Sequence, residues 1–269
     1  MSHRADIVIG GVRVAVSTAS PTFIGMLRER YAGFLETPAS ADFEFEIEVV
    51  APPEDAPDED VRVYRDGGEW RIERGDFRAR FDPAARRGHI RQSENPYSID
   101  TVLRIVHTLV LAREGGFLMH AASALRGGRA HLFAGVSGAG KTTISRLAPA
   151  DARLLSDEIS YVRRVDGGYR AFGTPFAGEL ARPGENVSAP LEAIYLLAQG
   201  PRNRIEPVPV AEAARALLAN VLFFAEDAAL VQAVFAAVLD LAERVPVRRL
   251  TFVPDARVWD LIGHEELAA

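Results

Sequence analysis

A glycine-rich segment in the middle of the chain contains the residue types that bind polyphosphates. Residues 135–143 read Gly-Val-Ser-Gly-Ala-Gly-Lys-Thr-Thr and fit the pattern G-x-x-x-x-G-K-[ST] at every position. In this pattern glycines let backbone N–H groups approach phosphate oxygens, the lysine neutralises phosphate charge, and the hydroxyl after it ligates Mg²⁺. The residues expected to bind the phosphates are Gly135, Ser137, Gly138, Ala139, Gly140, Lys141, Thr142 and Thr143. Thr142 is also expected to bind the metal ion.

The distribution of basic residues supports this prediction. The 31 basic residues are 30 arginines and one lysine, and that lysine is Lys141. A lysine carries a compact ammonium group on a flexible stem, which suits the reach to the β- and γ-phosphates. The plain alternative is a glycine-rich turn that only joins a strand to a helix. The apolar run at 130–134, the helix expected after the loop and the place of the only lysine favour a nucleoside triphosphate, MgATP, as the ligand.

A pair of carboxylates follows the loop at short range. Residues 154–158 read Leu-Leu-Ser-Asp-Glu, so an apolar strand ends in Asp157 and Glu158. Mg²⁺ prefers oxygen ligands of this kind, whereas the plain alternative is an exposed turn with two acids. Asp157 lies sixteen positions after Lys141, too few for the long helix and extra strand that most phosphate-loop NTPases insert before their acidic strand. The sequence therefore predicts a compact nucleotide-binding domain.

Several segments together resemble the kinase domain of HPr kinase/phosphorylase and the related ATP-dependent phosphoenolpyruvate carboxykinases. Met119-His120 precedes the loop like a Met-His-Gly segment of HPr kinases, with Ala121 in place of the glycine. The loop is similar to the carboxykinase loop, and residues 156–158 resemble the acidic pair of both families, with Asp-Glu instead of Asp-Asp. Residues 173–179, Gly-Thr-Pro-Phe-Ala-Gly-Glu, resemble a segment common in HPr-kinase-like proteins. The resemblance covers about residues 117–255 and leaves residues 1–97 unassigned.

The resemblance implies roles for the acidic and histidine residues. It makes Asp157 the base for the acceptor hydroxyl and Glu158 a metal ligand, with the two roles open to exchange. It places His120 beside the transferred phosphate, although a lone histidine in a strand is more often structural. Glu179 is a candidate for orienting the metal or the substrate, against the alternative of a solvated loop glutamate. Three arginines on predicted loops are further candidates for contacting the γ-phosphate: Arg182, Arg202 and Arg204.

The hydrophobic pattern predicts an α/β (α+β) fold with two parts. Residues 1–97 form a β-rich region, in which residues 43–49 alternate strictly between apolar and acidic side chains, as a half-buried strand does. A helix at 98–113 opens a phosphate-loop kinase domain at 98–269, which has a mixed sheet and C-terminal helices. The helices of this domain are expected at 211–224, at 228–242 and after the last strand at 247–252.

The bulk composition limits the classes of partner and compartment. The net charge of -6 and the pI near 5.6 argue against nucleic acid or an anionic membrane as partner. There are no cysteines, which excludes disulfides and thiolate metal sites. The first residues carry no apolar core of the signal-peptide type, and the apolar stretches are too short for a bilayer span. We therefore expect a cytoplasmic protein, and a homo-oligomer is compatible with the sequence.

The favoured hypothesis is a MgATP-dependent kinase that phosphorylates a serine-type hydroxyl of a small protein or peptide, with residues 1–97 helping to recognise this acceptor. One alternative is a small-molecule phosphotransferase or carboxykinase-like enzyme, which needs a basic pocket that a chain with one lysine is less able to supply. Another alternative is a nucleotide-binding sensor without transfer chemistry. The sequence leaves open the acceptor and the choice among ATP, GTP and pyrophosphate.

Overall fold

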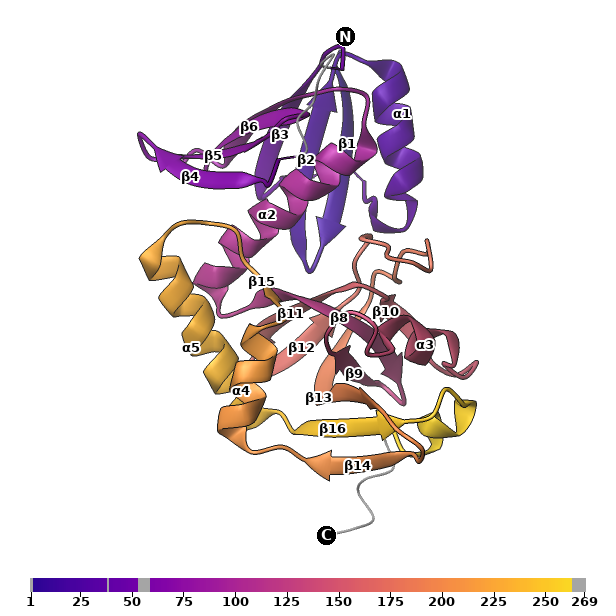
Figure 1. Cartoon of the computed structure of the whole chain (residues 1–269). Helices are drawn as coiled ribbons and strands as arrows, with labels where there is room; N and C mark the ends of the chain where they lie inside the picture. The colour runs from indigo at the N-terminus through magenta and orange to yellow at the C-terminus, as the bar shows by residue number, and fades with distance from the viewer. Residues whose placement is uncertain (1, 38, 53–58, 263–269) are drawn as a thin grey trace. The chain divides into compact units, whose positions relative to one another are not determined.

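The computed structural model describes residues 2–37, 39–52 and 59–262, and the chain divides into two compact units. The first unit comprises Met1–Leu109 and Phe223–Val231, and the second comprises Val110–Leu222 and Gln232–Ala269. Each unit has its own mixed sheet with few helices (Figure 1), so the fold is mixed α/β. The division falls within helix α2 (Pro96–Glu114), whereas the sequence pattern predicts a boundary at residue 97. No helix in the described ranges is long and apolar enough to cross a membrane.

The first unit is built on a seven-stranded sheet in which one face is apolar. In strand β3 (Phe43–Val49) the side chains of Phe45 and Ile47 are buried and the glutamates that alternate with them are exposed, as the sequence pattern predicts. The strand order is β1-β2-β3-β7-β6-β5-β4, and β3 runs parallel to both of its neighbours. The strands are β1 (His3–Ile9), β2 (Val12–Thr18), β3 (Phe43–Val49), β4 (Arg62–Asp66), β5 (Glu69–Arg74), β6 (Phe77–Asp82) and β7 (Arg87–Gln92).

The first unit contains all of helix α1 and most of helix α2, and α1 was not predicted. Helix α1 (Pro21–Arg30) starts at Ser20, whose hydroxyl accepts a hydrogen bond from the backbone N–H of Phe23. A serine followed by proline is a signal for the start of a helix, and the prediction of a β-rich region at 1–97 did not include it. Helix α2 (Pro96–Glu114) matches the predicted helix at 98–113 and carries a buried Asp100, which accepts hydrogen bonds from the end of α1 and from the residue after it.

The second unit contains a nine-stranded mixed sheet. Strand β13 runs parallel to both β9 and β16, while β8 and β9 form an antiparallel hairpin. The strands are β8 (Phe117–Arg126), β9 (Arg129–Ala134), β10 (Arg153–Ser156), β11 (Ile159–Val165), β12 (Gly168–Phe172), β13 (Ser188–Gln199), β14 (Arg204–Pro207), β15 (Val221–Leu222) and β16 (Val247–Phe252). The helices are α3 (Lys141–Arg146), α4 (Val210–Leu218) and α5 (Ala228–Arg244), the last of which begins in the first unit.

Three predicted elements of this unit differ in the structure. The helix predicted at 211–224 ends at Leu218, because the chain then forms β15 and pairs with β8. A loop was predicted where Arg204–Pro207 forms β14 beside β16. Between β16 and residue 262 the chain forms the 3-10 turn η2 (Ala256–Asp260) and no α-helix, and the rest of the predicted C-terminal helix falls on residues 263–269, outside the described residues.

An aromatic core supports helix α3 and the strand before it. The ring of Phe133 on β9 stacks on Tyr195 at a centroid distance of 5.6 Å and meets Trp259 edge-on at 5.4 Å. The indole Nε1 of Trp259 donates a hydrogen bond of 3.0 Å to the backbone carbonyl of Ile144 in α3. The core therefore holds both ends of the glycine-rich segment.

Candidate functional site

The glycine-rich loop joins the carboxyl end of β9 to the start of α3, in the strand-loop-helix order that the sequence predicts. Gly138 and Gly140 have φ values of 78° and 111°, in the left-handed region that favours glycine. A Cβ added to Gly140 would lie 2.7 Å from Cζ of the buried Phe252, and a Cβ added to Gly135 would lie 2.8 Å from that of Ala139. Gly135 and Gly140 are thus required for the backbone path and for its close approach to the core.

Hydrogen bonds within the unit hold the loop open toward its pocket. The amide of Gln199, at the end of β13, donates a 2.8 Å bond to the carbonyl of Gly138. The ammonium group of Lys141 donates to the carbonyls of Gly135 at 2.8 Å and Val136 at 3.2 Å. Burial lowers the pKa of Lys141, and the charges of Glu158 and Glu179 oppose this shift. The only lysine of the chain therefore stands at the pocket wall with its charge only partly balanced.

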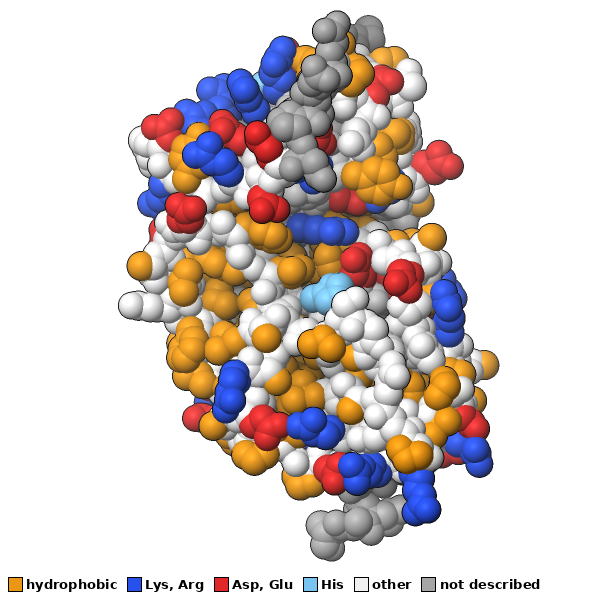
Figure 2. Space-filling view, viewed as in Figure 1, with side chains coloured by type: hydrophobic (Ala, Val, Ile, Leu, Met, Phe, Trp, Pro, Cys, Tyr) orange, Lys and Arg blue, Asp and Glu red, His pale blue; other side chains and the backbone are white. Residues whose placement is uncertain are grey.

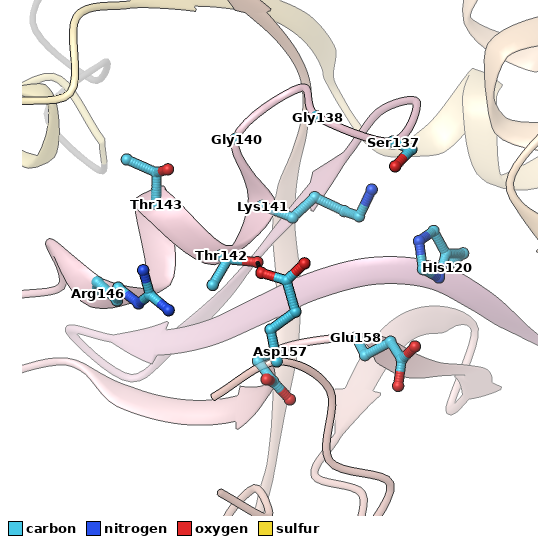
Figure 3. A pocket seen from close by; sticks show the side chains of 11 residues that line it. His120, Ser137, Gly138, Gly140, Lys141, Thr142, Thr143, Arg146, Asp157 and Glu158 are labelled. Carbon is cyan, nitrogen blue, oxygen red and sulfur yellow. Dashed lines mark hydrogen bonds between the residues drawn. The ribbon is translucent and has the colours of Figure 1, made fainter. Parts of the chain in front are cut away.

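A pocket of about 330 Å³ lies beside the loop, within the second unit (Figure 3). This volume is at the lower end of the range for small-molecule sites. Side chains from β8, the loop, α3, the turn after β10 and the segment after β12 meet in it. It is lined by His120, Ser137, Gly138, Gly140, Lys141, Thr142, Thr143, Arg146, Asp157, Glu158 and Glu179.

The carboxylate of Asp157 is buried and fixed by backbone amides. Its Oδ1 accepts a bond of 2.9 Å from the N–H of Gly178, and its Oδ2 accepts one of 2.9 Å from the N–H of Leu180. A Cβ on Gly178 would approach that of Glu158 to 2.8 Å, so the chain passes the acidic pair too closely for a side chain there. A carboxylate has about four lone-pair directions, so each oxygen keeps one for another partner.

The other predicted polar residues reach the same pocket from different elements. His120 is on β8 opposite Ile159, one residue from Glu158, and its backbone N–H donates to the carbonyl of Asn220 at 2.7 Å. In Figure 3, His120 lies across the pocket from Thr142. The hydroxyl of Thr142 donates a 3.0 Å bond to Oε2 of Glu179. The site thus unites residues separated by up to about sixty positions in the chain.

The structure does not place the predicted arginines in the pocket. Arg182 and Arg202 are exposed and do not line it, and Arg204 is on β14, with its guanidinium 3.2 Å from Glu206. Arg146 lines the pocket instead. The helix expected after the loop could have predicted this, because Arg146 is four positions after Thr142 and thus on the same face of α3.

The residues present fit a magnesium-bound triphosphate. The hydroxyl of Thr142 and the carboxylates of Asp157 and Glu158 supply oxygen ligands for the metal, and the pocket is also lined by Gly138, Gly140 and Lys141 of the glycine-rich loop. In the described part of the chain, no group of three or more His, Asp and Glu side chains could hold a metal by itself. Mg²⁺ commonly takes only one or two protein carboxylates, with phosphates and water as its other ligands.

Comparisons with known proteins give one family match. A family model described as SynChlorMet cassette protein ScmC matches residues 90–267, which are 178 of the 269 residues. No curated protein matches. Among solved structures, the Hpr(Ser) kinase/phosphatase from Coxiella burnetii is similar at 12% identity and a TM-score of 0.25, covering 47% of this chain and 90% of that chain. A likeness at this TM-score carries no argument about the fold.

Proposed function

The chain belongs to the family of the SynChlorMet cassette protein ScmC, and we propose that it is a MgATP-dependent kinase acting on a serine-type hydroxyl of a small protein or peptide. One observation carries this proposal. The only lysine, on a phosphate-type glycine loop, faces the same pocket as a buried carboxylate that two backbone amides orient. Phosphoryl transfer requires charge neutralisation, positioning and a proton acceptor, and this pocket contains a group for each task.

The donor would bind along the loop. The amides of the loop and Lys141 contact the β- and γ-phosphates, and Arg146 adds a guanidinium on the same side of the pocket. To reach the phosphates, Lys141 exchanges its two backbone carbonyl partners for phosphate oxygens. The exchange is favourable because a charge-assisted bond to an anion is stronger than a bond to a neutral carbonyl.

The reaction then follows from the positions of the carboxylates. A bound Mg²⁺, held by Thr142 and Glu158, would neutralise charge on the phosphates. The acceptor hydroxyl oxygen attacks the γ-phosphorus, its proton passes to the carboxylate of Asp157, and the bond to the β–γ bridging oxygen breaks with its electron pair leaving on ADP. The two amides that hold Asp157 keep its free lone pairs directed at the acceptor. His120 lines the wall of this space and is a candidate for positioning the acceptor.

The replacement Asp157→Asn separates transfer from binding. The purified chain is incubated with γ-labelled ATP and the small proteins or peptides encoded beside its gene, and nucleotide affinity is measured in parallel. We expect transfer to fall by about a hundredfold or more, as on loss of a general base, while nucleotide affinity changes little. The matched control is Asp166→Asn, an exposed turn residue with φ of 52° at which asparagine is well tolerated.

The outcomes discriminate among the candidate functions. Transfer at the wild-type rate by the Asp157→Asn protein would remove Asp157 as the base. Nucleotide binding without labelling of any acceptor would favour the sensor function. Labelling of a small metabolite instead of a polypeptide would favour a small-molecule phosphotransferase.

A further inference from the structure

Arginines gather on one face of the sheet of the first unit. The apolar side chains of β5, β6 and β7 are buried, so the residues between them point to the opposite, solvent-facing side. In Figure 2, basic side chains form a group over the part of the first unit where Figure 1 draws β4 to β6. The central basic residues of this face, named here the arginine face, are Arg71, Arg78, Arg80, His89 and Arg91.

The strand register places these residues directly opposite one another. Arg78 on β6 is the partner of Arg91 on β7, and Arg80 is the partner of both His89 on β7 and Arg71 on β5. Opposite residues in antiparallel strands have Cβ atoms about 5 Å apart, and like charges at this distance are destabilising. The folded unit therefore gains nothing internally from these pairings.

The outer arginines of the face have carboxylate partners, whereas the central two have none among the residues that the structure describes. The guanidinium of Arg71 lies 3.2 Å from Asp66 and 3.4 Å from Glu69, and that of Arg91 lies 3.5 Å from Glu48. Within residues 2–37, 39–52 and 59–262, the side chains of Arg78 and Arg80 make no hydrogen bond or ion pair. So far as the described residues go, these two exposed guanidinium groups have no carboxylate partner.

The spacing of these two groups fits an extended acidic peptide. Arg78 and Arg80 are two residues apart on one strand, which is about 7 Å. Alternate side chains of an extended peptide repeat at the same distance, so carboxylates at positions i and i+2 can meet both guanidinium groups at once. Arginine suits this contact because its planar fork binds a carboxylate through two parallel bonds.

Acidic residues on both sides of the arginine face disfavour the binding of polyanions that would cover the whole face. Strand β3 presents Glu44, Glu46 and Glu48 on one side, and Glu73 on β5 lies opposite Arg78 on the other. A nucleic-acid duplex or an anionic membrane would cover these carboxylates as well as the arginines, which costs electrostatic free energy. A single extended segment can contact β6 and β7 without covering β3.

We propose that the arginine face binds an extended acidic segment of a polypeptide partner through Arg78 and Arg80. Identifying that partner as the phosphoryl acceptor rests on the proposed function. The binding itself does not depend on it, because the face belongs to the first unit and the nucleotide pocket to the second.

Binding of a synthetic peptide tests the proposal. The probe is a fluorescein-labelled peptide of four Glu-Ala repeats, titrated with the full-length protein and followed by fluorescence anisotropy at low salt. We expect the double variant Arg78→Gln, Arg80→Gln to bind about tenfold more weakly, since two exposed ion pairs are lost. The matched control, Arg113→Gln with Arg215→Gln, removes two exposed arginines elsewhere and should bind as the wild type does.

Further outcomes decide between the proposal and its rivals. Charge reversal, Arg78→Glu with Arg80→Glu, should bind a Lys-Ala repeat peptide that the wild type does not bind. The proposal is overturned if the wild type fails to bind the acidic peptide, or if both double Gln variants bind it equally well. It is also overturned if a 12-base-pair DNA duplex or vesicles of anionic phospholipid bind more tightly than the peptide and depend on Arg78 and Arg80. ATP affinity measured on the same proteins reports separately on the nucleotide pocket, and its failure would count against the proposed function only.

Discussion

Replacement of Gly140 by alanine would test the geometry of the glycine-rich loop directly. The residue has φ of 111° and ψ of 20°, a backbone conformation that costs an L-residue about 1–2 kcal/mol. Its added Cβ would also lie 2.7 Å from Cζ of Phe252, which is only 3% exposed. Overpacking of a buried site costs about 1–3 kcal/mol more. We therefore expect the Gly140→Ala variant to lose about 2–5 kcal/mol of unfolding free energy.

A second glycine of the same loop provides the control. Gly138 has φ of 78°, and a Cβ added there would meet no heavy atom within 4 Å. Its replacement by alanine should carry the backbone cost alone, about 1–2 kcal/mol. The excess loss at Gly140 is thus the free energy of the contact with Phe252. Shortening that ring to leucine should relieve it, so the double variant Gly140→Ala, Phe252→Leu should lose less than the two single variants together.

Urea unfolding followed by tryptophan fluorescence measures these differences, because Trp259 belongs to the same core cluster as Phe252. The nucleotide affinity of each folded variant should fall in the same order as its stability, because the loop amides are displaced with the backbone. Equal losses in the Gly138 and Gly140 variants would refute the steric reasoning. Simple additivity of the Gly140 and Phe252 changes would refute it independently.

Two further predictions concern the charge states of buried groups. The replacement Lys141→Met should weaken ATP binding at least about tenfold. It should leave the free energy of unfolding unchanged or higher, because burial already disfavours the ammonium group. A loss of unfolding free energy in urea as large as the loss of binding free energy would contradict this. For His131, burial and then the nearby Arg126 lower the pKa from 6.5 to about 4. As the pH falls, the imidazole of His131 is therefore protonated in the unfolded chain before it is protonated in the folded chain. The free energy of unfolding is highest above pH 6.5 and decreases from there toward pH 4, by up to about 1.4 kcal/mol per pH unit. Unfolding of the His131→Leu variant at several pH values should show a shallower decline, and an unchanged slope would exclude this histidine as a cause.

Local patterns predicted the parts of the structure that local physics determines. The alternation at 43–49 became β3, and the apolar face at 98–113 became α2, because each buries one side of a regular element. The residues flanking the glycine-rich loop form a strand and a helix for the same reason. Arg146 was missed because the loop pattern ends before it and only the helical repeat of α3 brings it to the pocket.

Long-range pairing set the features that the sequence did not predict. The segment 223–231 belongs to the first unit although it follows α4 in the chain. Ala225 forms a parallel bridge with Val63 of β4, and the N–H of Glu226 donates a hydrogen bond of 3.3 Å to the carbonyl of Val63. Such contacts depend on which sheet edge is free, and no periodicity within the segment encodes this. The division of the chain within two helices has the same origin.

The segment after β12 links the two acidic parts of the candidate site. Its amides at Gly178 and Leu180 hold Asp157, and the carboxylate of the residue between them, Glu179, accepts a hydrogen bond from the hydroxyl of Thr142. A hydroxyl has one proton and two lone pairs, so a hydroxyl that donates its hydrogen bond to a carboxylate keeps its lone pairs for a metal ion. Glu179 would then orient Thr142 as a metal ligand without touching the metal itself. Under the proposed function the two contacts of this segment are therefore coupled, since a displacement of residues 178–180 would release both the proposed base and the hydroxyl proposed to bind the metal.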